Sequence, residues 1–318
     1  MYNVFIDGQV GTTGLQIFER LKKRDDIILT EIPYADRKND TIKREYLNSA
    51  DLVILCLPDQ AARVSVKMVS NPQVKILDAS TAHRTEPNWV YGLPELNPDQ
   101  REKIRNALFV ANPGCYSTGF LLGMVPLIKL GIVNRDYPIS INAVSGYSGG
   151  GRQLVEKYRA HQEVSSDDPW DYRPYSFQLA HKHIPEMVKY AGLTDKPVFA
   201  PAVADFEQGM LVSVPLIFRH LQSDSSIEMI QSVLEDYYKN ERFVSVLPAN
   251  DFESLDEGFL SPVKCNNTNR LDLLVFGNDE QVIVTARLDN LGKGASGAAI
   301  QNMNIMLGID EDKGLNTI

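Results

Sequence analysis

Short apolar segments alternate with amphipathic segments through the first third of the sequence, and this alternation most restricts the fold. The apolar segments have the length and the Val, Ile and Leu content of buried strands; they cover residues 2–6, 27–32, 52–57, 74–77 and 108–111. Helices are predicted between them, at residues 14–22, 41–48, 61–69 and 98–105. Strands that alternate with helices form a parallel sheet with both faces covered. The sequence therefore predicts an α/β fold that begins with a parallel sheet.

The pattern changes in the second part of the chain, where strands are longer and few helices interrupt them. The predicted strands are residues 139–144, 198–203, 211–218, 243–247, 271–276 and 281–288, and the helices are residues 152–161 and 227–238. This pattern favours an α+β domain with a mixed, largely antiparallel sheet. A last predicted helix, residues 293–307, contains small residues that allow close backbone approach. We expect domains at 1–111 and 112–290, with residues 291–318 completing the first one.

Composition excludes several classes of protein. The 318 residues have a net charge of −9 and no basic block, which argues against nucleic acid or an anionic membrane as partner. No apolar run is long enough to span a bilayer, and the N-terminus leads into a strand without the layout of a signal peptide. The three cysteines are far apart, which suggests reduced thiols in a cytoplasm. No Cys or His spacing is typical of zinc, so no metal is expected.

One of the three cysteines has a reactive setting. Cys115 lies in NPGCYST, between a predicted buried strand and an apolar helix at residues 117–125. A thiol on the first turn of a helix lies near the positive end of the helix dipole and near backbone N–H groups, which favour the thiolate and can hold an oxyanion. Cys115 is therefore a candidate nucleophile that binds an acyl group; a small residue packed at a strand–helix joint is the alternative. Cys56 lies in an apolar strand, and Cys265 does not open a helix.

A glycine-rich turn, DGQVGTTG, follows the first predicted strand and precedes the first helix. This GxxGxxG spacing lets the backbone approach a pyrophosphate at a helix N-terminus, as in Rossmann-type domains. The candidate cofactor-binding residues are Gly8, Gly11, Thr12, Thr13 and Gly14, with Ser80 after the fourth strand. Arg37 and Lys38 follow the second strand and favour a 2′-phosphate, hence NADP. The alternatives are that both cations are only solvated, and that Asp36 beside them favours NAD.

Two further loops contain candidate anion-binding groups. Arg84 follows the fourth strand in DASTAHR, at the sheet edge where ligands bind, and its guanidinium can fork a phosphate or carboxylate. A structural ion pair is the alternative for Arg84, and its neighbour His83 is not expected to be catalytic. The loop SGYSGGGR exposes backbone N–H groups at its glycines, and Ser148 and Arg152 add donors. A flexible loop is the alternative there.

The segment HKHIPE provides a candidate general acid/base. Residues two apart point to opposite sides of a strand and well apart on a helix, so we expect only one of His181 and His183 to face the thiol. Pro185 suits the first turn of a helix that continues to residue 190. Glu186 could orient an imidazole, and a histidine beside a thiolate can move a proton in acyl transfer.

Together these motifs resemble those of the N-acetyl-γ-glutamyl-phosphate reductases. DGQVGTTG, DASTAHR, VYGLPELN, NPGCYST, SGYSGGGR, HKHIPE and GKGASGAAIQNMN follow the order of that family, and the chain is similar to its shorter type over essentially the whole length. The resemblance implies a Rossmann-type NADP domain, a catalytic and oligomerisation domain, and a C-terminal helix that packs back on the cofactor domain. It also implies a homodimer or homotetramer built on the second sheet.

The resemblance further implies reduction of N-acetyl-γ-glutamyl phosphate to N-acetylglutamate 5-semialdehyde by NADPH, with release of phosphate, in arginine biosynthesis. Cys115 would form a thioester, and His181 resembles the family's catalytic histidine, with Glu186 five residues on. The implied substrate-binding residues are Arg84, Ser148, Arg152 and His183. Segment 161–175 is a candidate lid, since hydride chemistry on a thioester gains from the exclusion of water.

Three alternatives remain open. A related acyl-phosphate reductase, above all aspartate-semialdehyde dehydrogenase, shares the two-domain plan and the thiol chemistry. A non-catalytic NADP-binding regulatory protein would need the glycine-rich turn but not the thiol. A hydrolase that uses Cys115 without a cofactor would leave the glycine-rich turn unexplained.

Overall fold

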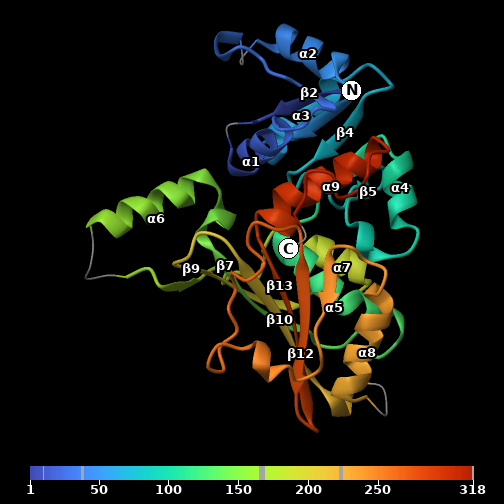
Figure 1. Cartoon of the computed structure of the whole chain (residues 1–318), viewed down its shortest axis with the longest axis vertical. Coiled ribbons are helices and arrows are strands. Elements are labelled where there is room, and N and C mark those ends of the chain that lie inside the picture. Colours follow the sequence, from blue (N-terminus) through green and yellow to red (C-terminus); the bar gives the residue numbers. More distant parts are fainter. Residues whose placement is uncertain (10, 37–38, 165–168, 222–224, 317–318) are drawn as a thin grey trace. The chain divides into compact units, whose positions relative to one another are not determined.

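The computed structural model describes residues 1–9, 11–36, 39–164, 169–221 and 225–316, and the chain divides into two compact units (Figure 1). Unit 1 contains Met1–Pro113 and Ala295–Leu315. Unit 2 contains Gly114–Gly294 and the last residues from Asn316 on. Each unit is described by itself below.

Unit 1 is built on a six-stranded sheet in the order β2-β1-β3-β4-β6-β5, and all its pairs are parallel. The strands are β1 (Tyr2–Asp7), β2 (Ile27–Thr30), β3 (Leu52–Leu55), β4 (Lys75–Asp78), β5 (Val90–Tyr91) and β6 (Phe109–Ala111). The helices are α1 (Thr12–Leu21), α2 (Asp40–Ser49), α3 (Asp59–Met68), α4 (Gln100–Asn106) and α9 (Gly297–Met306). This confirms the predicted parallel sheet; the two-residue β5 was not predicted.

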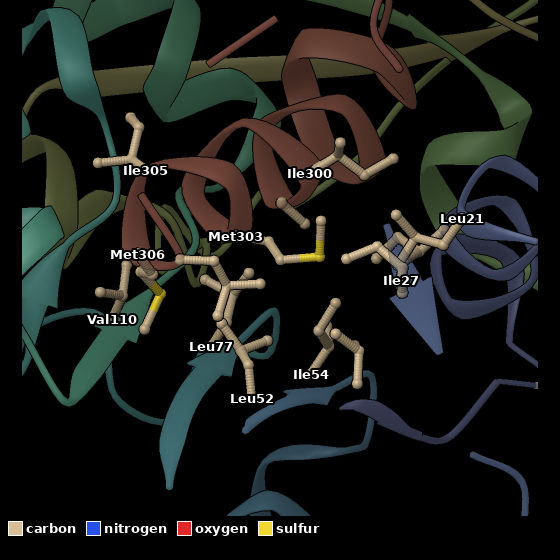
Figure 2. Close-up of a cluster of buried hydrophobic side chains, with 14 of the residues drawn as sticks. Leu21, Ile27, Leu52, Ile54, Leu77, Val110, Ile300, Met303, Ile305 and Met306 are labelled. Carbon is tan, nitrogen blue, oxygen red and sulfur yellow. The ribbon is translucent and has the colours of Figure 1, made fainter. Parts of the chain in front are cut away.

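The two faces of this sheet are buried in different apolar clusters, as the period of a strand requires. In β1, Val4 and Ile6 belong to one cluster and Phe5 to the other. Helix α9 covers the first of these faces, and Figure 2 shows Ile300 and Met303 directed toward the strand residues of the cluster. Because each fully buried side chain of this size contributes about 1.5–3 kcal/mol, the C-terminal helix is part of the core of unit 1.

Unit 2 contains a seven-stranded sheet in the order β11-β12-β13-β10-β7-β9-β8. Its strands are β7 (Ser140–Gly146), β8 (Tyr172–Pro174), β9 (Val198–Ala204), β10 (Met210–Ile217), β11 (Val244–Val246), β12 (Leu271–Gly277) and β13 (Gln281–Leu288). The pairs β7–β9 and β11–β12 are parallel and the other four are antiparallel. The predicted mixed, largely antiparallel sheet is therefore confirmed.

Helices α5 (Cys115–Lys129), α7 (Ile184–Ala191) and α8 (Ile227–Tyr238) lie together on one face of this sheet (Figure 1). Glycines let α5 approach the strands closely: a Cβ on Gly119 would come within 2.9 Å of the Val212 side chain. The fourth helix of unit 2 is α6 (Arg152–Val164). By register, the opposite face presents exposed residues, and these are Asn142, Val198, Ala200, Pro215 and Ile217.

Short 3-10 turns connect several elements, at Tyr34–Asp36, Pro94–Leu96, Tyr147–Gly150, Phe218–His220 and Phe252–Ser254, and a π-helical turn at Gly292–Ser296 precedes α9. Among the described helices, none combines the length and the apolar character needed to cross a bilayer. The described residues also contain no group of His, Cys, Asp and Glu that could hold a metal ion.

Candidate active site

Cys115 is the first residue of α5, and Gly114 is the N-cap with an extended backbone. From Ala111 to Ile128, a stretch described throughout, every residue is buried except Cys115, which is partly exposed. The helix is apolar all round because the sheet and two other helices cover it. Its first turn contains no acidic residue. The sequence therefore places an accessible thiol at the start of an otherwise buried helix, as predicted.

Glu186 of α7 supports the turn that precedes the thiol. Its buried carboxylate accepts the backbone N–H of Gly114 at 3.1 Å. Thr118 donates its hydroxyl to the carbonyl of the same glycine at 3.1 Å. One end of the NPGC turn is thus bound through both polar groups of Gly114, which fixes the direction in which α5 begins.

His181 and His183 lie together, contrary to the expectation that their side chains would diverge. The two ring centroids are 4.7 Å apart, and both rings pack against Tyr116, the residue after the nucleophile candidate. The segment is neither strand nor helix: His183 has a helical backbone as the N-cap of α7, and its N–H turns back onto Nδ1 of His181 at 3.1 Å. A turn of this kind brings side chains at i and i+2 to the same side.

The histidine pair is connected to the hydroxyl groups of two tyrosines, Tyr175 and Tyr116. The hydroxyl of Tyr175 lies 3.4 Å from Nε2 of His181 and donates to the hydroxyl of Tyr116 at 3.3 Å. Burial, with a smaller contribution from the charge of Cys115, raises the pKa of Tyr175 to about 12 against the opposing hydrogen bond to Tyr116. Burial also raises the pKa of Tyr116 well above its usual value, with contributions from Tyr175 and Cys115. Both phenols therefore stay protonated at neutral pH.

The glycine-rich loop of unit 2 is a 3-10 turn that presents one buried hydroxyl. Ser148 is buried and accepts a hydrogen bond from the Asn290 side chain at 2.9 Å. Asn290 is itself bound, since its Oδ1 accepts the N–H of Gly209 at 2.8 Å. Arg152, by contrast, is exposed at the start of α6 and pairs with Glu156 at 2.7 Å. The loop thus fixes Ser148, whereas Arg152 lies on the surface of the helix.

Gly294 contacts Cys115 from the end of unit 2. A Cβ at this position would lie 2.8 Å from Cβ of Cys115, which is closer than side chains approach. The sequence suggested that the small residues of this segment approach the cofactor domain. At Gly294 the close neighbour is instead the nucleophile candidate, within unit 2.

Unit 1 contains the glycine-rich turn, between β1 and α1. Gly8 has a φ of +95°, where a side chain would be strained, and its Cβ would meet the carbonyl of Cys56. A Cβ on Gly14 would lie 2.5 Å from the carbonyl oxygen of Gly8. Gly11 differs, because its nearest neighbours would be 3.6 Å away and its φ is −76°. Gly8 and Gly14 are therefore required by the turn itself, whereas Gly11 is not.

Helix α1 begins directly after Gly11, with Thr12 and Thr13 as its first two residues, both half-buried. No acidic residue lies in the first turn of α1, so the positive end of its dipole is not offset there. The predicted 2′-phosphate contacts, Arg37 and Lys38, lie outside the described residues.

The loop after β4 is organised by the buried carboxylate of Asp78. It accepts the backbone N–H and the hydroxyl of Ser80, at 2.9 and 2.8 Å, and it pairs with Nδ1 of His83 at 2.5 Å. The His83 ring stacks on Trp89. These contacts give His83 a structural role in the loop. They also direct the Ser80 hydroxyl toward Asp78.

Arg84 continues this loop and is buried. Its Nε donates to the carbonyl of Asn112 at 2.9 Å, and one terminal nitrogen lies 3.5 Å from the carbonyl of Ala79. The Asn112 side chain is held in turn by Asn302 of α9, at 3.0 Å. Arg84 thus lies at the carboxyl ends of β4 and β6, the edge where ligands bind in parallel sheets.

None of the three cysteines, all of them described, is in a disulfide. Cys56 follows β3, and burial of its thiol raises the pKa to about 12. Cys265 donates to Asp272 at 3.3 Å, and burial raises its pKa to about 11. Neither setting favours a thiolate, in agreement with the choice of Cys115.

The candidate lid, residues 161–175, is in its described parts attached to the rest of unit 2. Trp170 stacks on His161 at 4.1 Å and receives the guanidinium of Arg173 over its ring at 4.0 Å. Strand β8 pairs with β9, and the N–H of Tyr175 donates to the carbonyl of Pro201 at 3.0 Å. Residues 165–168 lie outside the described part of the chain.

Sequence reasoning missed three residues at this site. Tyr175 was included only as the last residue of the candidate lid, Asn290 lies outside the quoted motifs, and Gly294 was noted only as a small residue of GKGASGAAIQNMN. Tyr175 is preceded by a three-residue strand that has no alternation of its own. Only Gly294, a small residue inside the predicted helix at residues 293–307, gave a usable signal.

Two family models match the chain in separate parts. The model described as "Semialdehyde dehydrogenase, NAD binding domain" matches residues 22–104, and that described as "Semialdehyde dehydrogenase, dimerisation domain" matches residues 115–290. The second alone covers more than half of the chain.

Curated relatives are similar over nearly the full length. N-acetyl-gamma-glutamyl-phosphate reductase 2 of Nostoc sp. is 54% identical over 98% of each chain, and the enzyme of that name from Pseudomonas putida is 48% identical over 96% of each. Among solved structures, aspartate semialdehyde dehydrogenase II of Vibrio cholerae superposes with a TM-score of 0.74 over 97% of this chain and 98% of that one, at 15% identity. The Candida albicans aspartate semialdehyde dehydrogenase, solved with NADP, gives 0.63 over 96% and 98%, at 14% identity.

Proposed function

The chain belongs to the N-acetyl-γ-glutamyl-phosphate reductase family of oxidoreductases, and we propose that it reduces N-acetyl-γ-glutamyl phosphate to N-acetylglutamate 5-semialdehyde with NADPH, releasing phosphate, in arginine biosynthesis. Its relatives by name reduce an acyl phosphate, and a chain of the same fold has been solved with NADP. The observation that supports the proposal most is the partly exposed Cys115 at the start of buried helix α5.

Cys115 would act as the nucleophile. Its thiolate attacks the carbonyl carbon of the acyl phosphate, the carbon–oxygen bond to phosphate breaks, and a thioester remains on Sγ. After hydride addition to the thioester carbon, the carbon–sulfur bond breaks, the aldehyde leaves and the thiolate is restored. The helix N-terminus stabilises negative charge on sulfur in the first and last states, and the turn bound by Glu186 keeps it in place.

His181 would donate a proton or a hydrogen bond to the oxygen atoms of the reacting carbonyl and of the departing phosphate. It lies beside Tyr116, next to the nucleophile in sequence, and its Nδ1 is already occupied by the His183 amide. Nε2, which lies 3.4 Å from the Tyr175 hydroxyl, is then the nitrogen that would exchange this partner for the substrate and donate a proton or a hydrogen bond during the reaction. We assign Ser148 and His183, both buried in unit 2, to the substrate side. Arg152, exposed and paired with Glu156, would reach the substrate only by leaving that pair.

The residues of unit 1 fit a dinucleotide. A Cβ built on Gly11 would meet its neighbours only at ordinary van der Waals distance, at a turn whose helix has no acidic residue in its first turn, so backbone donors could hold a pyrophosphate there. The pyrophosphate would be held by the turn residues Gly8, Gly11, Thr12, Thr13 and Gly14. Ser80 would also contact the cofactor, and it lies in the same loop as Arg84, the proposed phosphate-binding residue of the substrate site. NADPH supplies the hydride when bound. Arg37 and Lys38 are the proposed 2′-phosphate contacts on the basis of sequence.

We further propose that unit 2 forms the oligomer interface and that the protein works in the cytoplasm as a homodimer or homotetramer. The family model that matches residues 115–290 is described as a dimerisation domain. The sheet face opposite α5, α7 and α8 presents apolar side chains such as Val198 and Ile217, 53% and 40% exposed, and burying them would be favourable.

The test is the reverse reaction with the purified protein. Phosphate-dependent reduction of NADP would be followed by NADPH absorbance with N-acetylglutamate semialdehyde and, separately, with aspartate semialdehyde. We expect a much higher kcat/KM for the first aldehyde. Faster reduction with aspartate semialdehyde would assign the chain to the alternative substrate, and phosphate-independent turnover would contradict acyl-phosphate chemistry.

A further inference from the structure

We propose that Tyr175 is a positioning residue for His181: its hydroxyl accepts a hydrogen bond from Nε2–H and fixes the orientation of the neutral imidazole beside Tyr116, the residue after Cys115. The inference deepens the proposed reductase function and rests on it for its catalytic part. It starts from five groups of unit 2 that form a continuous row of polar contacts, which are the His183 N–H, His181, Tyr175, Tyr116 and the Ala202 carbonyl.

The first step is the tautomer of His181. The backbone N–H of His183 donates to Nδ1 at 3.1 Å, so Nδ1 provides a lone pair and bears no proton. A neutral imidazole bears one proton on its two nitrogens. That proton must therefore be on Nε2. A backbone N–H cannot act as an acceptor, so this assignment follows from the chain and does not depend on the direction of any hydroxyl.

The second step is the direction of the tyrosine hydroxyls. Nε2 of His181 lies 3.4 Å from the hydroxyl oxygen of Tyr175, and since Nε2 holds the proton, the tyrosine oxygen is the acceptor. The Tyr175 proton then points to Tyr116, 3.3 Å away. Tyr116 donates in turn to the carbonyl of Ala202 at 3.3 Å. Every proton in the row has one acceptor, and the row ends on a backbone carbonyl of β9.

The third step is the protonation of the phenols. Burial raises the pKa of Tyr175 to about 12 and that of Tyr116 well above its usual value. Both remain O–H donors throughout the pH range in which an enzyme of this kind works. The bonds are long, at 3.3–3.4 Å, so each contributes little to stability. Their effect is to fix how the His181 ring is turned.

The loop between Tyr175 and His181 supports a functional reading of this arrangement. Ser176 and Leu179 have positive φ values of 63° and 53°, although neither is glycine. Such a backbone conformation is unfavourable for a residue with a side chain and persists only where the surroundings fix it. Here the N–H of Tyr175 is bound to Pro201, and Leu179 closes the turn on Ser176 at 3.0 Å. The strained turn is what returns the chain so that Tyr175 and His181 meet.

The test compares Tyr175→Phe with Tyr172→Phe in the full-length protein. Tyr172 is on the adjacent strand β8 and 62% exposed, so its substitution controls for the loss of a hydroxyl. In protein with ¹⁵N-labelled histidine, at neutral pH, the wild-type His181 signals should be those of the neutral Nε2–H tautomer, identified by their loss in His181→Asn. Tyr175→Phe should shift the Nε2–H signal, and Tyr172→Phe should leave it unchanged.

The second measurement is turnover. Tyr175→Phe should lower kcat at least about tenfold with little change in the KM for NADPH, because ring placement matters to proton transfer and not to cofactor binding. An unchanged Nε2–H signal, or an Nδ1–H tautomer in the wild type, would overturn the positioning role. A shifted signal with unchanged kcat would overturn its part in catalysis. The spectra need no substrate, so they decide the positioning role even if the proposed reductase reaction fails.

Discussion

The carboxylate of Glu186 accepts the backbone N–H of Gly114, the residue immediately before the nucleophile candidate. A helix N-terminus stabilises a thiolate through its unpaired N–H groups and its dipole, whereas a nearby carboxylate opposes a second negative charge. Glu186 therefore fixes the geometry of the turn at an electrostatic cost to the thiolate.

Glu186→Gln and Glu186→Ala should separate these two effects. Glutamine can still accept the Gly114 N–H but has no charge, so alkylation of Cys115 by iodoacetamide at a fixed pH should become faster while thermal stability changes little. Alanine leaves the buried N–H without this acceptor and should lower the free energy of unfolding by about 1–3 kcal/mol. Equal stability of the two variants would mean that the bond to Gly114 is unimportant.

Cys115 should be the one cysteine that reacts in the folded protein. Burial raises the pKa of Cys56 to about 12 and of Cys265 to about 11, so both remain thiols near neutral pH. Peptide mass mapping after brief alkylation should find the label on Cys115 alone, and on all three cysteines after denaturation. Cys115→Ala should abolish turnover while NADPH binding, followed by calorimetry, persists. Substantial turnover without Cys115 would contradict the thioester mechanism.

Gly8→Ala and Gly11→Ala should fail in different ways. At Gly8 the positive φ and the carbonyl of Cys56 leave no room, so alanine should cost more than about 2 kcal/mol of stability. At Gly11 the methyl group fits the fold but occupies the space proposed for a pyrophosphate. We expect Gly11→Ala to keep its Tm and to bind NADPH at least about tenfold more weakly, or about 1.4 kcal/mol. Normal NADPH affinity for this variant would exclude the turn as the pyrophosphate site.

Asp26 should make the stability of unit 1 depend on acid pH. Its carboxylate receives two hydrogen bonds from Arg24, at 2.9 and 2.6 Å, and lies 3.2 Å from Lys313. The Arg24 bonds lower the pKa of Asp26 well below its usual value against the opposing effect of burial, and Lys313 adds to the lowering. The stabilisation is therefore complete above the unfolded pKa of about 4 and is lost as the pH falls toward the folded pKa.

The free energy of unfolding would be measured by urea denaturation for the wild type and for Asp26→Asn, from neutral pH down through acid pH. At neutral pH the variant should be less stable by about 1 kcal/mol, since the pair is partly solvated. The difference should shrink steadily as the pH falls below about 4. A difference that stays constant with pH would show that the ion pair is not its source.

Ile217 provides a test of the interface. It is an exposed apolar residue on the face of the second sheet opposite α5, so Ile217→Lys should weaken self-association at least about tenfold in analytical ultracentrifugation. Ile28→Lys is a matched control, because Ile28 is 48% exposed on a strand of unit 1. Equal effects of the two substitutions would argue against this face as the interface.

Much of the fold was predictable because local pattern and final environment agree. Strand Gln281–Leu288 and helix Ile227–Tyr238 begin and end where their periodicity predicts. Strand β8 was not predicted, since its three residues are held by pairing with β9 and by nothing in their own sequence. Helix α5 begins at Cys115, directly after the Pro-Gly turn, and therefore before the predicted start at Ser117.

Individual residues of the candidate site could be predicted from the sequence, whereas the contacts between their side chains could not. Cys115 and His181 were chosen from motifs, but the expected divergence of His181 and His183 was wrong because a turn replaces regular structure there. Tyr175 reaches His181 through a strained loop, and its neighbours in sequence give no sign of that. A contact between two residues that a loop brings together cannot be predicted from the spacing of motifs in the sequence.

The position of α9 in the core of unit 1 has a consequence for the order in which the protein can be completed during synthesis. One face of the first sheet, at Leu52, Ile54 and Leu77, is covered by Ile300 and Met303 (Figure 2). More than two hundred residues separate the strand residues from Ile300 and Met303 in the sequence, and the ribosome makes all of them before it makes α9. Until α9 emerges, α1 and α4 cover that apolar face only in part, and exposed apolar surfaces invite aggregation. The first domain to be translated is therefore the last to be finished.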